Sequence, residues 1–161
     1  MNKDIYLLTG SNLGNRKQHL ETARRLLDTF GITQVAASAL YETASWGIAG
    51  QPNYYNQVLK VQTALGPVDL LRTLQAVEAQ MGRTREIKWE SRIIDIDILF
   101  YGHAIMREDF LTIPHPEIQN RRFTLVPMCD LAPEFMHPVL KKTTRELLET
   151  CTDDLAVKTV R

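Results

Sequence analysis

The chain has 161 residues, enough for one domain with a hydrophobic core and too few for two ordinary domains, so we expect a single domain spanning residues 1–161. Lysine plus arginine and aspartate plus glutamate each number 19, so no overall field draws the protein toward nucleic acid or an anionic membrane. Any recognition of an anion must therefore depend on local clusters of charge.

The first third of the chain predicts a strand, a helix and a second strand. An apolar run from Ile5 to Thr9 predicts the first strand, which ends at the turn 10–15. Apolar residues then recur at helical spacing from Leu20 to Phe30, and Gly31 ends this helix. Residues 35–41 predict the second strand, and residues 43–52 predict a long loop.

The turn at residues 10–15 has two interpretations. A glycine-containing turn before a helix can bind phosphate, but neither of the common glycine-rich phosphate motifs is present. The alternative is a turn in which Ser11, Asn12 or Asn15 caps the helix, and the residue types favour it.

The middle of the chain completes a recognisable order of elements. Residues 54–63 alternate as a third strand, a helix begins at Gly66-Pro67 and ends at Gly82, and a strand containing Asp95 and Asp97 follows a charged loop. The order βαββαβ is typical of the α+β ferredoxin-like fold, in which helices cover one face of an antiparallel sheet and leave the other available for ligands.

From about residue 102 we expect a C-terminal elaboration of this core. Residues 145–150 look helical, whereas residues 113–116 must be extended or turning because residues that precede proline avoid helical geometry.

Two carboxylates lie on one side of the last core strand. Successive strand residues face opposite ways, so Asp95 and Asp97 share a face and the isoleucines at 94, 96 and 98 share the other. A repeat of roughly 6 to 7 Å lets both acids bind one divalent metal or a close pair, and magnesium fits this description. The alternative is a half-exposed edge strand whose acids are solvated.

Cations suited to phosphate oxygens flank this strand. They are Arg83, Arg85, Lys88, Arg92, His115, Arg121 and Arg122. The charged loop 82–92 would ordinarily be solvated, but Trp89 within it favours stacking on a base. His115 stands between two prolines on a stiff segment, which favours a functional role more than for most histidines, but for a single histidine the structural or surface alternative stays open.

Other side chains are candidates for binding a flat heterocycle or a nucleotide. Tyr54 and Asn56 share a face of the third strand and offer an aromatic plane and an amide, with core packing as the alternative for Tyr54 and for Phe123. Gln75 and Glu78 share a helical edge, where they could point at one ligand or be solvated.

Taken together, these motifs resemble one enzyme family over nearly the whole chain. They are Gly10-Ser11-Asn12-Leu13, Tyr54-x-Asn56, Gln75-x-x-Glu78, Gly82-Arg83-x-Arg85, Trp89, Arg92-Ile93-Ile94-Asp95-Ile96-Asp97, Pro114-His115-Pro116, Ile118, Asn120-Arg121-Arg122-Phe123 and Ala132-Pro133. The chain resembles the 6-hydroxymethyl-7,8-dihydropterin pyrophosphokinases, which transfer pyrophosphate from ATP to a pterin alcohol in folate biosynthesis. The combination Arg-x-x-Asp-x-Asp with Pro-His-Pro-x-x-x-x-Arg is more specific than either motif alone.

The resemblance implies a role for each matched residue. Asp95 and Asp97 would hold two magnesium ions, and the catalytic residues would be Arg83, Arg92, Asp95 and Asp97. The residues implied to bind the co-substrate ATP are Gln75, Glu78, Arg85, Trp89, Arg92, Ile98, Thr112, His115 and Arg121. The residues implied to bind the pterin are Thr43, Ala44, Trp46, Tyr54, Asn56 and Phe123.

Two other classes of function fit parts of the pattern. A magnesium-dependent nucleotidyltransferase or nuclease also uses paired acids on a sheet face, although zero net charge argues against a polymeric substrate. A non-catalytic ferredoxin-like binding module would not need Asp95 and Asp97, and an RNA reader should carry a basic-aromatic run that is absent from the sequence.

The remaining features bear on the surroundings of the protein. Cys129 and Cys151 lack the spacing of metal ligands and are typical of reduced thiols, and the first apolar run is too short for a signal peptide or a membrane span. We therefore expect a soluble, cytoplasmic monomer that binds small molecules and has neither nucleic acid nor membrane as a partner.

Overall fold

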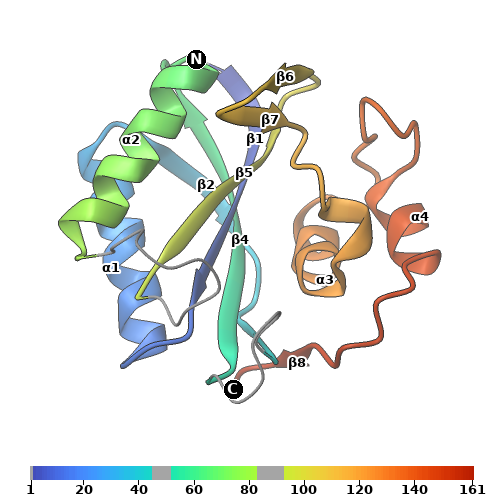
Figure 1. Ribbon diagram of the computed structural model, residues 1–161, viewed down its shortest axis with the longest axis horizontal. Helices are drawn as coiled ribbons and strands as arrows, with labels where there is room; N and C mark the ends of the chain where they lie inside the picture. The colour runs from blue at the N-terminus through green and yellow to red at the C-terminus, as the bar shows by residue number, and fades with distance from the viewer. Residues whose placement is uncertain (1, 45–51, 83–92) are drawn as a thin grey trace.

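The computed structural model describes residues 2–44, 52–82 and 93–161, and Figure 1 shows their arrangement. In chain order the elements are β1 (Asn2–Ser11), α1 (Arg16–Thr29), β2 (Thr33–Ala37), β3 (Tyr41–Thr43), β4 (Tyr54–Thr63), α2 (Pro67–Gln80), β5 (Asp95–Tyr101), β6 (Met106–Glu108), β7 (Leu111–Ile113), a 3-10 turn (Ile118–Asn120), α3 (Arg122–Leu131), α4 (Thr144–Glu149) and β8 (Lys158–Thr159). Through β5 the elements follow the expected order except that two strands, β2 and β3, stand where one was expected at residues 35–41. The C-terminal elaboration consists of a hairpin, two helices and a short strand.

Six of the described strands form one antiparallel sheet, and β6 and β7 form a separate two-stranded sheet. The order of the six-stranded sheet is β5-β1-β4-β3-β8, and β2 also pairs with β4, so the end of the chain returns to the sheet beside β3. In β1, Gly10 lies opposite Asp95 of β5 on one side and opposite Asn56 of β4 on the other. Two residues earlier in β1, Leu8 lies opposite Asp97 of β5. Because directly opposed residues point to the same face, Asp95, Asp97 and Asn56 share one face of the sheet.

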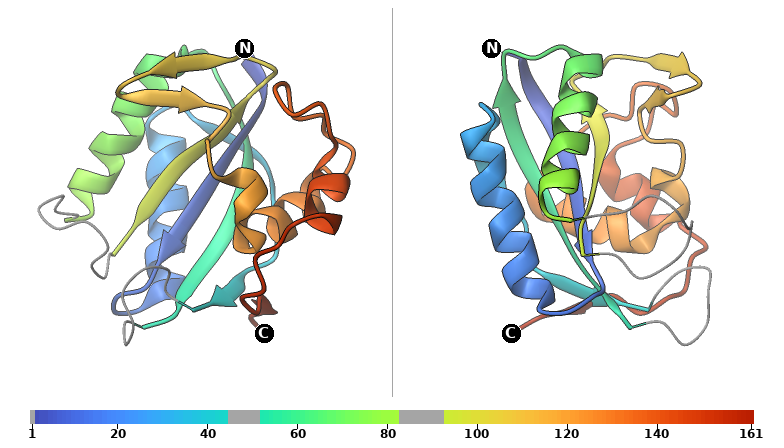
Figure 2. Two further views of the ribbon diagram at one scale, coloured as in Figure 1. Left: turned by 45° about the vertical axis from the view of Figure 1, so that its right-hand side comes forward. Right: turned by 60° about the vertical axis from the view of Figure 1, so that its left-hand side comes forward.

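Helices pack against both faces of the sheet. Side chains of α1 and α2, such as Leu27 and Leu74, form one core with Leu7 and Ile98. Side chains of α3 and α4 form a second core with residues such as Leu8 on the opposite face, and Figures 1 and 2 show these helices across the sheet from α1 and α2. The expectation that one face stays free of helices is therefore wrong, because α3 and α4 cover part of the face that carries the aspartates.

The ends of the helices follow from local chemistry. The Asn15 side chain accepts a hydrogen bond from the Gln18 backbone N–H at 3.1 Å, so the predicted capping role of this turn is confirmed. Pro67 begins α2, and Gly31 and Gly82, with φ of +81° and +89°, follow the last turns of α1 and α2.

The predicted strand at residues 35–41 is wrong as one element. It is divided into β2 and β3 because Ser38 interrupts the ladder: its hydroxyl accepts from the Val58 N–H at 2.9 Å and donates to the Ala39 carbonyl at 2.8 Å. The Gln57 amide also donates to the Ser38 carbonyl at 2.8 Å. This break leaves β3 free to pair with the outer half of β4, where Thr43 lies opposite Tyr54.

Cys129 and Cys151 are both free thiols, as the sequence indicates. Among the residues that the structure describes, no helix combines the length and the apolar character needed to cross a bilayer.

Candidate active site

The site is organised around Gly10, which lies in the central strand β1 between Asp95 and Asn56. A Cβ atom added to Gly10 would lie 3.2 Å from Asn56 Oδ1 and 3.4 Å from Tyr54 Cδ1. The missing side chain therefore lets Tyr54 and Asn56 lean over β1, toward the strand that carries the aspartates. Sequence reasoning predicted a shared face for Tyr54 and Asn56, and the register confirms it.

Asn56 is buried, with 3% of its surface exposed. Within residues 2–44, 52–82 and 93–161, its side-chain amide makes no hydrogen bond, and its nitrogen and oxygen are not among the unpaired polar atoms that are sealed from solvent. The Asn56 amide thus offers both a donor and an acceptor to a ligand seated over Gly10.

Asp95 and Asp97 are both half-buried and project from the same face of β5, as their spacing predicts. No group of three or more histidine, cysteine or acidic residues suited to a metal occurs in the described part of the chain. Two carboxylates still fit magnesium, because this ion is commonly bound by one or two carboxylates together with water and the phosphates of a nucleotide. The oxygen donors of Asp95 and Asp97 therefore suit a magnesium–nucleotide complex better than a metal site made entirely of protein.

Glu78 supports the strand that carries the aspartates. Its side chain is 3% exposed, and Oε2 accepts a hydrogen bond at 2.9 Å from the backbone N–H of Ile96, the residue between Asp95 and Asp97. β5 is an edge strand of the described sheet, so the outer edge of β5 has no neighbouring strand to accept from its backbone N–H groups. The Glu78 carboxylate accepts from one of them, the N–H of Ile96. Gln75 is exposed, so the two residues of the predicted helical edge lie in different environments. The solvated alternative is wrong for Glu78, and its contact with ATP stays a prediction.

His115 is partly buried beside the other end of β5. Its backbone N–H donates to the Leu99 carbonyl at 2.9 Å, and its Nδ1 accepts from the Glu117 N–H at 3.1 Å. Burial, together with the positive charge of Arg121, lowers the pKa of His115 to about 4. The imidazole is therefore neutral near pH 7, with its proton on Nε2, where it can donate to an anionic oxygen.

Acidification should destabilise the protein through His115. The pKa is about 4 in the folded chain and 6.5 for an unperturbed histidine, so between these values the unfolded chain binds more protons. The free energy of unfolding should be undiminished above pH 6.5 and fall by about 3 kcal/mol as the pH approaches 4. Urea unfolding at about pH 7 and pH 4.5 should show a smaller loss for His115→Gln than for the wild type. Equal losses would contradict this assignment, since the other buried histidine, His137, is common to both proteins.

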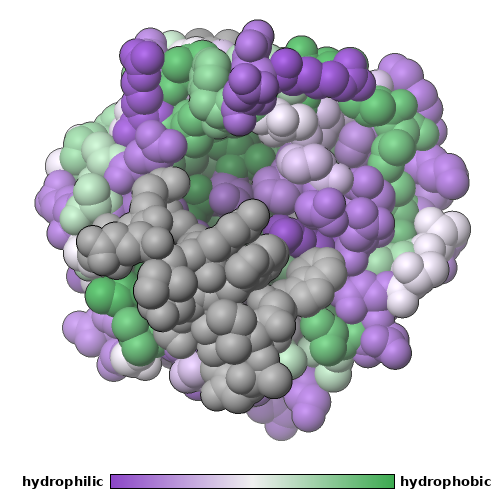
Figure 3. Space-filling model, viewed as in Figure 1, coloured by the Kyte–Doolittle hydropathy of each residue, from purple (hydrophilic) through white to green (hydrophobic). Residues whose placement is uncertain are grey.

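The start of α3 brings Arg121 and Phe123 to the same side of the sheet. The Arg121 guanidinium lies 5.6 Å from the centre of the Phe123 ring, and Phe123 packs against the second core. Figure 3 shows that the face between α2 and α3 is hollowed, with hydrophilic residues around an apolar floor. Sequence reasoning placed Phe123 in a motif but did not predict the helix that carries it.

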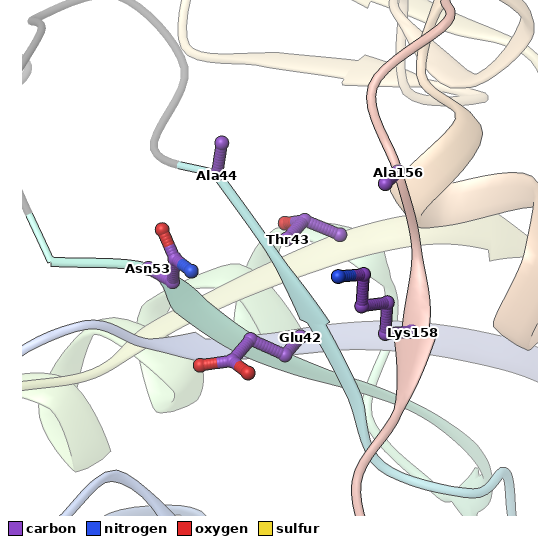
Figure 4. Close-up of a pocket in the computed structure, with 6 residues that line it drawn as sticks. All are labelled: Glu42, Thr43, Ala44, Asn53, Ala156 and Lys158. Atoms are coloured by element: carbon purple, nitrogen blue, oxygen red, sulfur yellow. The ribbon is translucent and has the colours of Figure 1, made fainter.

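A second opening lies where β3, β4 and β8 meet. It has a volume of about 180 Å³ and is lined by Glu42, Thr43, Ala44, Asn53, Ala156 and Lys158. Thr43 is buried and lies opposite Tyr54, and Figure 4 shows the Lys158 side chain extending from β8 toward β3. Lys158 and Ala156 were missed by sequence reasoning, because only tertiary folding brings the end of the chain beside β3.

Several predicted site residues lie outside the described residues: Trp46, Arg83, Arg85, Lys88, Trp89 and Arg92. The predictions for them and for the loops that contain them are therefore not addressed by the structure. Ile98 is buried in the core with Leu7, so a contact with ATP would have to involve its backbone. Thr112 is partly exposed in β7 and lies opposite Arg107.

Comparison with known proteins identifies a matching family. The family described as 7,8-dihydro-6-hydroxymethylpterin-pyrophosphokinase matches residues 6–133. The 2-amino-4-hydroxy-6-hydroxymethyldihydropteridine pyrophosphokinase of Aquifex aeolicus is 37% identical over 142 residues, covering 88% of each chain. The folic acid synthesis protein fol1 of Pneumocystis carinii is 41% identical over 138 residues, covering 86% of this chain and 19% of that protein.

Solved structures agree on the fold. A crystal structure of Plasmodium falciparum HPPK-DHPS with pteroate superposes with a TM-score of 0.75 at 17% identity, over 92% of this chain and 44% of that chain. The present chain thus spans about a fifth of the fol1 protein and less than half of the Plasmodium protein, but nearly all of the Aquifex protein.

Proposed function

Because the chain belongs to the 7,8-dihydro-6-hydroxymethylpterin-pyrophosphokinase family, we propose that it transfers the pyrophosphoryl group of ATP to the hydroxymethyl group of 6-hydroxymethyl-7,8-dihydropterin, a step of folate biosynthesis that releases AMP. The observation that carries this proposal is the row of residues across β5, β1 and β4. Two half-buried carboxylates lie at one end of the row, and the amide of Asn56, which makes no hydrogen bond within the described residues, lies at the other. An anionic, metal-binding reactant and a flat heterocycle therefore meet over Gly10.

The pterin would occupy the end of the row formed by β4. The Asn56 amide can donate to and accept from the edge of a heterocycle, and the ring of Tyr54 beside it offers a stacking surface. Phe123 from α3 would cover the opposite face of the pterin. Thr43 and Ala44, with Trp46, would contribute contacts at the edge of β3.

The triphosphate of ATP would lie at the end formed by β5. Asp95 and Asp97 would hold two magnesium ions, which supply neutralisation of the phosphate charge and orientation of the phosphate oxygens. His115 would donate from Nε2 to a phosphate oxygen, and Arg121 would add a positive charge next to it. The remaining proposed ATP contacts are Gln75, Glu78, Arg85, Trp89, Arg92, Thr112 and the backbone of Ile98.

The reaction needs no covalent enzyme intermediate. The hydroxymethyl oxygen of the pterin attacks the β-phosphorus of ATP, the bond from this phosphorus to the α-phosphate bridging oxygen breaks, and AMP leaves. The hydroxyl proton passes to Asp97 or to solvent. Arg83 and Arg92 would stabilise charge on the transferring group, and exclusion of water would prevent hydrolysis of ATP.

The position of β1 between β5 and β4, with β2 and β3 outside β4, supports a ferredoxin-like class for the core. We propose that the protein works as a cytoplasmic monomer on small molecules alone.

Product analysis tests the function. The purified chain, incubated with ATP, magnesium and the pterin alcohol, should form AMP only when the pterin is present. ADP as the nucleotide product would contradict pyrophosphoryl transfer, and pyrophosphate release with incorporation of AMP would favour the nucleotidyltransferase alternative. A reaction without magnesium is the matched control, and it should give no AMP.

A further inference from the structure

We propose that Arg16, which makes no contact with the row of site residues, is a positioning residue for the pterin end of the site. This inference rests on the proposed function, because it concerns how the same site is held in shape. Arg16 is the first residue of α1, and it lies near the ends of β3 and β4. It belongs to none of the motifs that predicted the site.

The Arg16 guanidinium makes three contacts at once. Nη1 donates to Glu42 Oε2 at 3.0 Å and to the Asn53 carbonyl at 2.8 Å, and the guanidinium carbon lies 3.9 Å from the centre of the Tyr55 ring. The side chains of Arg16 and Glu42 are 25% and 34% exposed, so this ion pair is partly withdrawn from water. A partly buried guanidinium with hydrogen bonds and a stacked ring holds its partners more firmly than an exposed ion pair does.

Two of these contacts are made with Asn53 and Tyr55, the residues immediately before and after Tyr54 in the sequence. Arg16 holds the backbone of Asn53 on one side of Tyr54 and the ring of Tyr55 on the other. Because strand residues alternate between faces, fixing Tyr55 on one face sets the direction of Tyr54 and Asn56 on the other. The same guanidinium therefore fixes the backbone from which both proposed pterin-binding side chains project.

Two further observations place the contacts of Arg16 at the pterin end of β4. Glu42 lies directly opposite Tyr55, and its neighbour Thr43 lies opposite Tyr54, so the ion pair also ties β3 to the pterin end of β4. The Asn12 side chain, in the turn before α1, donates to the Pro52 carbonyl at 3.2 Å. The turn and first residue of α1 thus hold the chain just before Tyr54 at two successive carbonyls, those of Pro52 and Asn53.

Binding measurements on Arg16→Ala test the inference. The dissociation constant of the pterin alcohol, measured with a non-hydrolysable ATP analogue present, should rise about tenfold, because small misplacements of a binding group are costly. The dissociation constant of the ATP analogue alone should stay within about twofold. Arg25→Ala is the matched control, because Arg25 lies on the same helix and its guanidinium donates only to Thr22 within the described part of the chain.

A merely structural role would lower the melting temperature and leave the ratio of the two dissociation constants unchanged, and that result would overturn the inference. Arg16→Lys keeps the charge but not the planar fork, so it should restore the pterin affinity only in part. If Arg16→Ala does not fold, Arg16→Gln provides the same comparison. Wild-type protein that forms no AMP would overturn the proposed function, whereas active wild type with unchanged pterin binding in the variant would overturn only the role of Arg16.

Discussion

Replacing Asp97 with asparagine should lower turnover by about 1,000-fold or more, equal to about 4 kcal/mol in the activation free energy. The change keeps the size of the side chain and removes the charge that would hold magnesium against the triphosphate. It should leave the fold intact, because Asp97 is half-buried near a second carboxylate, and removing a like charge need not destabilise the protein. Turnover measured at saturating ATP and pterin, alongside thermal unfolding, checks both statements.

Asp95→Asn should behave in the same way, since both acids project from one face of β5. Asp109→Asn is the matched control, because Asp109 is exposed beyond β6 and its replacement should change turnover by less than about twofold. A turnover near that of the wild type in the Asp97 or the Asp95 variant would rule out the proposed metal site. A large loss accompanied by unfolding would instead contradict the expectation that the acids serve function alone.

The second large effect should come from Asn56. Asn56→Ala should raise the KM for the pterin about 100-fold, equal to about 3 kcal/mol, and leave the KM for ATP within about twofold. The reason is that Asn56 is a largely buried residue whose amide makes no hydrogen bond within the described structure, so its donor and acceptor are available to the ligand. Without the Asn56 amide, the polar groups at the edge of the bound pterin would be desolvated and unpaired, and binding would be weaker.

Steady-state kinetics with each substrate varied in turn distinguish this result from a general loss. Gln62→Ala, near the other end of β4, is the matched control and should leave both KM values unchanged. Equal increases for ATP and the pterin would contradict a pterin-specific role for Asn56. The variant should not lose stability, because no hydrogen bond within the described protein is removed.

The strand alternation of residues 94–98 was enough to predict the shared face of Asp95 and Asp97, because the side-chain period of a strand is set locally. The same alternation predicted that Tyr54 and Asn56 share a face of their strand. Local rules also predicted the ends of α1 and α2, where Asn15 and the glycines act within a few residues of the helix.

Features that depend on distant parts of the chain could not be read in this way. Glu78 resembled a surface residue of an amphipathic helix, and only the end position of β5 in the sheet explains its burial. The helix α3 escaped prediction because Pro127 lies inside it, and proline ordinarily marks a helix boundary. Lys158 is more than a hundred residues from Thr43 in sequence, and it reaches the same opening only because β8 pairs with β3.

The fate of the two outer phosphates of ATP distinguishes pyrophosphoryl transfer from every other use of the nucleotide. ATP labelled at either the β- or the γ-phosphorus is incubated with the purified chain, magnesium and the pterin alcohol, and the pterin product is isolated. We expect both labels to enter the pterin product in equal amounts, with one AMP formed for each pterin consumed. Entry of the γ label alone with formation of ADP, or recovery of both labels as free phosphate or pyrophosphate, would contradict the account.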